Sequence, residues 1–108
     1  MKKIYSLKNK QLFQKILMEG KKVYNEYFLI FYFSADETKI GISIPKKHGN
    51  AVFRNKQKRQ IKNIIAKFSN LNLLKKNLVI IAKPNFYNLD FKKKEQIIIN
   101  LLNKFIAN

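Results

Sequence analysis

The chain contains no cysteine and no tryptophan, and it has only two prolines and three glycines. The absence of cysteine excludes disulfide bridges and cysteine-ligated zinc sites, and it is typical of proteins in the reducing cytoplasm. No apolar run approaches the ~20 residues that a membrane-spanning helix needs. The basic start of the chain is not followed by an apolar segment of signal-peptide length. We therefore expect a cytoplasmic protein with no membrane partner.

Acidic residues are also scarce, and the few present are unevenly placed. Six Asp and Glu residues face 23 Lys and Arg residues, which gives a net charge of +17 on 108 residues. Between Thr38 and Leu89 there is no acidic residue at all, whereas ten lysines and both arginines of the chain fall there. A general richness in lysine would not explain the missing acids. A surface of one sign repels itself, so the charge indicates a polyanionic partner such as nucleic acid.

The same scarcity bears on catalysis. A protein that hydrolyses phosphodiesters usually needs clustered carboxylates for metal ions or a pair of histidines for proton transfer. The only histidine is His48, which is either a pH-sensitive phosphate contact or, more simply, a loop residue without a role. No phosphate-binding glycine loop and no metal-ligand spacing is present. We predict no catalytic residue, no metal ligand and no cofactor bound by the protein.

The hydrophobic pattern predicts one α+β domain over residues 1–108. Gly20, Pro45 and Pro84 interrupt the pattern at intervals, and Asn50 and Asp90 are suited to begin helices. The patterns predict a helix over 10–19, strands over 27–33 and 39–44, a helix over 51–68, a strand over 78–82 and a helix after Asp90, with a further short strand near 22–24. The order is α-β-β-(β)-α-β-α, an α-β sandwich in which helices pack on a small mixed sheet.

The aromatic strand over 27–33 leaves one question open. Leu29, Phe31 and Phe33 point to one face, and Phe28 and Ile30 point to the other. A single sheet needs only one such face for its core. The other face is covered by a helix or remains a platform on which bases stack.

The segment KKHGNAVFRNKQKRQIK over 46–62 contains the strongest functional pattern. On a helical repeat, Ile61 and Ile65 define a core-facing side, and that side continues back through Gln57 to Arg54. The helix is therefore apolar in its second half and basic in its first. Charge runs are often merely solvated helix faces, but here no acid is available for pairing, and both arginines are present. Arginine can fork two hydrogen bonds onto a phosphate or a guanine edge, so we predict nucleic-acid binding.

The motif GNAVFRNKQKRQIKNII, with GISI and the Lys46-Lys47 pair before it, resembles the signature of the bacterial ribonuclease P protein family. The resemblance extends over nearly the whole chain. It implies a left-handed βαβ crossover around the basic helix, an exception to the usual handedness. It also implies a monomeric protein subunit that binds the catalytic RNA and the 5′ leader of precursor tRNA, while the RNA, with Mg²⁺, performs the cleavage.

The resemblance implies two sets of site residues. Those placed at the catalytic RNA and nearby substrate are Lys46, Lys47, Asn50, Arg54, Asn55, Lys56, Lys58, Arg59 and Lys62. Those placed in a leader-binding cleft between the first helix and the sheet are Phe13, Leu17, Leu29, Phe31 and Ser43. Four positions depart from the family pattern. Lys56 replaces an arginine, Leu17 stands where an aromatic residue is common, Ser6 where a basic residue is common, and Pro45 where a small polar residue is usual.

Three other functions are compatible with parts of the sequence. A structural RNA-binding protein of the ribosomal type, with no role in tRNA processing, would share the charge and the small α/β fold. A DNA-binding regulator would use the helix over 51–68 but would need a helix-turn-helix and usually a dimer interface. A stand-alone nuclease would need the acids that the chain lacks.

Overall fold

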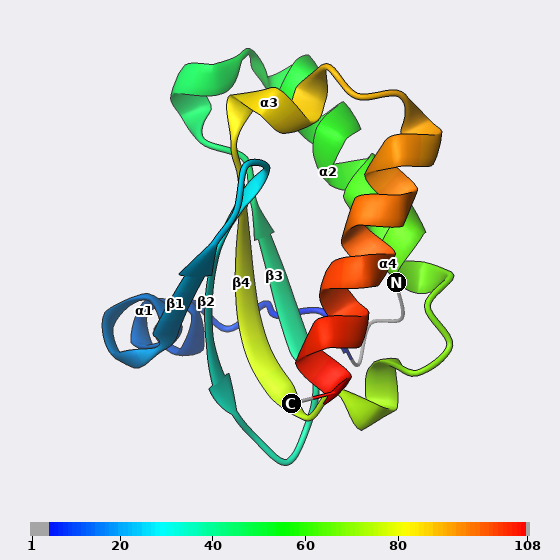
Figure 1. Cartoon of the computed structure of the whole chain (residues 1–108). Coiled ribbons are helices and arrows are strands. Elements are labelled where there is room, and N and C mark those ends of the chain that lie inside the picture. The colour runs from blue at the N-terminus through cyan, green and yellow to red at the C-terminus, as the bar shows by residue number, and fades with distance from the viewer. Residues whose placement is uncertain (1–4, 108) are drawn as a thin grey trace.

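The computed structural model describes residues 5–107 and has the predicted α+β architecture (Figure 1). Two 3₁₀ turns, η2 (Lys46–His48) and η3 (Leu71–Leu73), and the short helix α3 were not predicted. The other elements follow the predicted order, including the additional strand near 22–24. The helices are α1 (Lys10–Glu19), α2 (Ala51–Ala66), α3 (Pro84–Tyr87) and α4 (Phe91–Ala107), and the strands are β1 (Lys21–Tyr24), β2 (Phe28–Ser34), β3 (Lys39–Ser43) and β4 (Lys76–Ala82).

Side-chain caps begin three of the helices. Asn9, Asn50 and Asp90 each accept hydrogen bonds from backbone N–H groups in the first turn of the helix that follows. Helix α2 ends at Ala66, two residues before the predicted end. The N–H groups of Lys67 and Phe68 bond to carbonyls three residues back, so the last turn tightens into a 3₁₀ geometry.

The four strands form one mixed sheet in the order β1-β2-β4-β3. The β1–β2 and β2–β4 pairs are antiparallel, and β3 and β4 are parallel neighbours joined by α2. The segment β3-α2-β4 is therefore the βαβ unit for which the family resemblance implies a left-handed connection. That handedness stays a prediction.

The two faces of the sheet are covered unequally. Helices α2 and α4 lie over one face, and α1 lies over the other (Figure 1). Under α2 and α4, Phe28 and Ile30 of β2 are buried with Ile61 and Leu102 in the main core. On the α1 face, Leu29, Phe31 and Phe33 are only half-buried. One face of β2 thus forms the core, and the other is partly open.

Within residues 5–107, no helix combines the length and apolar character required to cross a membrane.

Candidate nucleic-acid interface

The nine basic and amide residues predicted to bind RNA lie in one continuous stretch, from η2 through the first three turns of α2. Lys67 forms an ion pair with Glu95 at 3.0 Å, and no ion pair is found for the nine predicted residues within residues 5–107. None of the predicted residues is therefore neutralised by a carboxylate. The exposed members are Lys46, Lys47, Asn50, Asn55, Lys56, Arg59 and Lys62, and the half-buried members are Arg54 and Lys58.

Helix α2 presents most of these side chains on the side that faces away from α4. Its buried stripe begins at Gln57 and continues through Ile61 and Ile65. Residues four apart lie above one another on a helix. A row of Arg54, Lys58 and Lys62, with Asn55 and Arg59 beside it, therefore flanks this stripe. We call these five residues the basic row.

Lys56 is exposed and lies at the margin of the basic row. It is three residues before Arg59 and next to Asn55, so on the helical repeat it borders the row on the side toward α4. Desolvation and then the charge of Lys56 lower the pKa of Lys94 on α4. The six predicted α2 residues therefore occupy neighbouring positions around the helix, with Lys56 at the margin toward α4.

The start of α2 is preorganised by hydrogen bonds that leave donors free for a ligand. The Nε of Arg54 donates to the Gly49 carbonyl at 3.1 Å, which leaves the terminal guanidinium nitrogens available to fork onto a phosphate. The Oδ1 of Asn50 accepts from the backbone N–H of Phe53 at 2.9 Å. Its amide nitrogen therefore remains available as a donor.

A cluster that sequence reasoning missed fixes η2 against α2. The hydroxyl of Tyr87, in α3, and the Nδ1 of His48 are 2.7 Å apart, and the Tyr87 ring packs edge-on against Phe53 at 5.0 Å. A Cβ on Gly49 would lie 2.6 Å from the Phe53 ring, so glycine is what allows the loop to approach it. Burial raises the pKa of Tyr87, and the protonated hydroxyl can donate to His48. His48 therefore positions the basic loop through Tyr87.

Lys94 of α4 makes a second set of contacts with α2 that the sequence did not indicate. Its side chain is 4% exposed, and its Nζ donates to the Oε1 of Gln57 at 3.0 Å and to the Oε1 of Gln60 at 2.8 Å. The ammonium also lies 5.1 Å from the centre of the Phe86 ring. Desolvation, followed by the charge of Lys56, lowers its pKa. Lys94 thereby joins α4 to α2 at Gln57 and Gln60.

The predicted leader residues gather on the face of the sheet under α1. A Cβ on Gly41 of β3 would lie 3.4 Å from the Phe13 ring, and one on Gly20 would lie 3.0 Å from the Tyr32 carbonyl of β2. Helix α1 therefore crosses the sheet from β3 to β2. Phe13 and Leu17 are four residues apart and share one side of this helix.

The strand residues of the cleft lie in two adjacent rows. Leu29, Ile81 and Ser43 are register partners across β2, β4 and β3, and they form the first row. Phe31 is in the second row, which continues through Val79 to Gly41. The five predicted cleft residues are all half-buried: Phe13, Leu17, Leu29, Phe31 and Ser43. A partly open apolar strip therefore lies beside α1.

Strand β3 connects the apolar strip to the basic stretch along the chain. This strand is an edge of the sheet, it contains Ser43, and it leads within three residues to Lys46 and the start of α2. A single-stranded polyanion could therefore contact cations at this edge and continue onto the strip.

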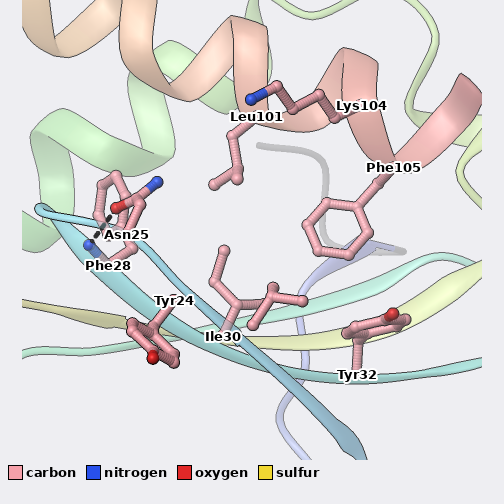
Figure 2. A pocket seen from close by; sticks show the side chains of 9 residues that line it. Tyr24, Asn25, Phe28, Ile30, Tyr32, Leu101, Lys104 and Phe105 are labelled. Atoms are coloured by element: carbon pink, nitrogen blue, oxygen red, sulfur yellow. Dashed lines mark hydrogen bonds between the residues drawn. The ribbon is translucent and has the colours of Figure 1, made fainter.

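A separate pocket lies on the other face, between the β1–β2 hairpin and α4 (Figure 2). It has a volume of about 230 Å³, and its lining includes Val23, Ile30, Leu101 and Phe105. It contains none of the predicted site residues. Among residues 5–107, no three His, Asp or Glu side chains are grouped so that they could hold a metal ion.

Comparisons with known proteins agree on one family. The family model described as Ribonuclease P matches residues 1–106. The ribonuclease P protein component of Mycoplasmopsis pulmonis is 42% identical over 106 residues, which cover 97% of this chain and 95% of that protein. The ribonuclease P protein from Thermotoga maritima superposes with a TM-score of 0.78 at 29% identity, covering 92% of this chain and 96% of that one. The Staphylococcus aureus ribonuclease P protein superposes with a TM-score of 0.74 at 31% identity, with coverages of 97% and 94%.

Proposed function

The chain belongs to the ribonuclease P protein family, whose members are the protein component of the enzyme that processes tRNA. On this premise we propose that two parts of its surface bind two different RNAs. The basic row binds the catalytic RNA subunit and nearby substrate, and the strip beneath α1 binds the single-stranded 5′ leader of precursor tRNA. The observation that supports this division is the junction at β3 between an acid-free basic helix and a half-open apolar sheet face.

The basic row suits a folded RNA. Arg54 and Arg59 present guanidinium groups without carboxylate partners, and Arg54 is held at its Nε by Gly49. Such groups bind phosphates in a fork geometry and release counterions when they do so. Lys46, Lys47 and Asn50 extend the positive surface to the loop before α2. Lys56 adds a further cation at the margin of the row toward α4.

The strip suits an unpaired RNA strand. Phe13, Phe31 and Leu29 present apolar surface on which bases can stack, and Ser43 can hydrogen-bond to a base or sugar. Because Leu17 is aliphatic, it contributes apolar contact in place of ring stacking. The protein thus holds the leader while the tRNA body is bound elsewhere in the ribonucleoprotein.

Cleavage itself is assigned to the RNA subunit with Mg²⁺, in a cytoplasmic complex containing one copy of the protein. The chain has only six acidic side chains and one histidine to supply a metal site or proton transfer. The Nδ1 of that histidine, His48, is hydrogen-bonded to the hydroxyl of Tyr87. The protein's part is to screen phosphate repulsion, to stabilise the folded RNA and to raise the affinity for substrate.

Cleavage of a precursor tRNA by a bacterial ribonuclease P RNA at low Mg²⁺ tests the proposal. The wild-type protein should stimulate cleavage strongly, and protein without RNA should cleave nothing. Arg54→Ala with Arg59→Ala should lower the affinity for the RNA by about tenfold or more, since each charged contact contributes roughly 1 kcal/mol or more. Lys104→Ala removes a cation from α4, far along the chain from the basic row, and is the control.

Two results would favour other functions. Tight RNA binding without any stimulation would indicate a structural RNA-binding protein. Equal affinity for duplex DNA and folded RNA would indicate a regulator that binds through α2.

A further inference from the structure

Tyr24, at the end of strand β1, is a large aromatic residue that none of the functions above uses. It is 72% exposed on an edge strand of the sheet. An exposed aromatic ring on a protein of net charge +17 is suited to contact an unpaired base, because every base offers a flat face for stacking.

The sheet register places Tyr24 in the same row as the leader-binding residues. Tyr24 is the register partner of Leu29, Leu29 of Ile81, and Ile81 of Ser43. Partners across a sheet point to the same face. The row Ser43–Ile81–Leu29 therefore continues onto Tyr24 without a break. In Figure 2 the Tyr24 ring accordingly points away from Leu101 and Phe105 of α4.

Lys83 supplies a cation beside this ring. Its Nζ lies 5.1 Å from the ring centre of Tyr24 and donates to the Asn25 carbonyl at 2.6 Å, while its backbone N–H donates to the Tyr27 carbonyl at 2.9 Å. The ammonium is thus fixed against the turn that follows β1. A ring with a cation at its side can take a base and the phosphate next to it.

The turn that carries Tyr24 is itself ordered before any ligand binds. The Oδ1 of Asn25 accepts from the N–H groups of Tyr27 and Phe28, both at 2.8 Å. A second cation, Lys22, is exposed one row away, as the register partner of Phe31. Tyr24 therefore has a fixed backbone, one neighbouring cation in contact and another on the same face.

We propose that Tyr24, Lys83 and Lys22 form a further subsite for single-stranded RNA, in which Tyr24 stacks on a base and the lysines contact the adjoining phosphates. The subsite rests on the proposed leader binding and extends it. Since β1 is the sheet edge opposite β3, the subsite binds leader nucleotides farther from the basic row than those at Ser43 and Leu29.

Affinity measured against leader length tests the subsite. The holoenzyme is reconstituted with a bacterial ribonuclease P RNA and given precursor tRNAs whose leaders lengthen one nucleotide at a time. With long leaders, Tyr24→Ala should weaken binding by about fivefold or more, as the loss of one stacked base predicts. With the shortest leaders it should bind like the wild type, and Tyr24→Phe should match the wild type throughout.

Matched variants separate stacking and charge from general effects. Lys22→Gln should weaken binding of long leaders, whereas Lys21→Gln, on the same strand but pointing to the opposite face, should not. Val23→Ala is the corresponding control for Tyr24→Ala. A 2-aminopurine base at the critical leader position should be quenched by the wild type and by Tyr24→Phe, and not by Tyr24→Ala.

The outcomes distinguish this inference from the proposed function. If wild-type affinity does not depend on leader length, leader binding as a whole is wrong. If it does, and Phe31→Ala weakens binding while Tyr24→Ala does not, only the subsite is wrong. An equal loss for Tyr24→Ala at every leader length would also overturn the subsite. The subsite would also be wrong if the free wild-type protein sedimented as a dimer and free Tyr24→Ala as a monomer, because the β1 edge would then pair with a second copy.

Discussion

Lys94 shows how a single side chain can connect the core to the basic helix α2. A buried ammonium normally requires a carboxylate partner, yet Lys94 has two glutamine oxygens and the face of Phe86. The arrangement also satisfies Gln57, which is 5% exposed and would otherwise have a buried acceptor without a partner. The stability of α2 on α4 therefore depends on the pair as a unit.

We predict that Lys94→Met destabilises the protein by about 1–2 kcal/mol, because it leaves a buried amide oxygen unpaired, and that adding Gln57→Leu restores most of the loss. Urea unfolding of the wild type, both single variants and the double variant measures the coupling. Independent, additive losses would contradict the argument.

The lowered pKa of Lys94 makes the free energy of unfolding of the protein depend on pH. The folded state releases the proton at a lower pH than the unfolded chain, whose lysine titrates near 10.5. Between these two pKa values the unfolded state binds more protons, so the free energy of unfolding rises with pH. The wild type should therefore gain stability relative to Lys94→Met as the pH approaches 10.5, and unfolding curves at pH 7 and above measure the difference. If the difference in unfolding free energy between the wild type and Lys94→Met stays the same at every pH, burial does not lower the pKa of this ammonium.

At the scale of elements, Asn50 caps the start of α2 and is also one of the residues proposed to bind RNA. The side-chain oxygen caps the helix through Phe53, which leaves the amide nitrogen as a donor. A capping oxygen stabilises a helix by about 1 kcal/mol, and an anion at this position also interacts favourably with the helix dipole. A substitution that keeps the side-chain oxygen of residue 50 and removes its amide nitrogen therefore separates capping from RNA binding.

We predict that Asn50→Ala lowers the free energy of unfolding by about 1 kcal/mol, and that Asn50→Asp preserves it but weakens RNA binding. The aspartate retains the cap, removes the amide donor and places a negative charge beside the bound phosphates. Thermal unfolding and RNA titration of both variants, with Asn9→Asp at the cap of α1 as the control, measure the two effects. An Asn50→Asp variant that binds RNA as the wild type does would show that Asn50 is only a cap.

The elements themselves could be predicted from local signals, whereas their contacts could not. The end of α1 before Gly20, the caps at Asn50 and Asp90 and the alternation along β2 are properties of short segments, and the structure has them as predicted. Helix α3 spans only four residues and has no periodic pattern, so the contact between Tyr87 and His48 had no sequence signal. The row that joins Tyr24 to Ser43 depends on the strand order, which places β4 between β2 and β3.

The basic motif shows the same limit within one helix. The charge run and the helical repeat predicted a basic side on α2, and the structure has Arg54, Lys58 and Lys62 along it. The contact of Lys94 with Gln57 and Gln60 follows only once α4 is placed. Local pattern therefore identified the basic segment, and tertiary packing determined which side of the helix α4 covers.

At the scale of the whole molecule, the charge opposes folding in the absence of RNA. The chain has 23 basic and six acidic residues, so most of the cations have no carboxylate to pair with. The ion pair between Lys67 and Glu95 lies near the surface, and such pairs contribute little to stability. Self-repulsion of the remaining cations lowers the stability of the compact state and is relieved when anions bind. We therefore expect RNA binding and folding to be thermodynamically linked.

We predict that sulfate raises the melting temperature by more than chloride at equal ionic strength. Ionic strength alone screens the repulsion, whereas a divalent anion also binds clustered cations of the folded state and stabilises it by mass action. An anion at 100 times its dissociation constant contributes about 2.7 kcal/mol, which corresponds to a rise of roughly 10 °C or more for a chain of this size. Circular dichroism melts in the two salts measure the shift.

The extra rise of the melting temperature in sulfate should shrink in Arg54→Ala with Arg59→Ala, because the basic row then has fewer cations to bind the anion. Identical cooperative melts in both salts would show that the charge is tolerated by screening alone and that the fold is complete without a bound anion.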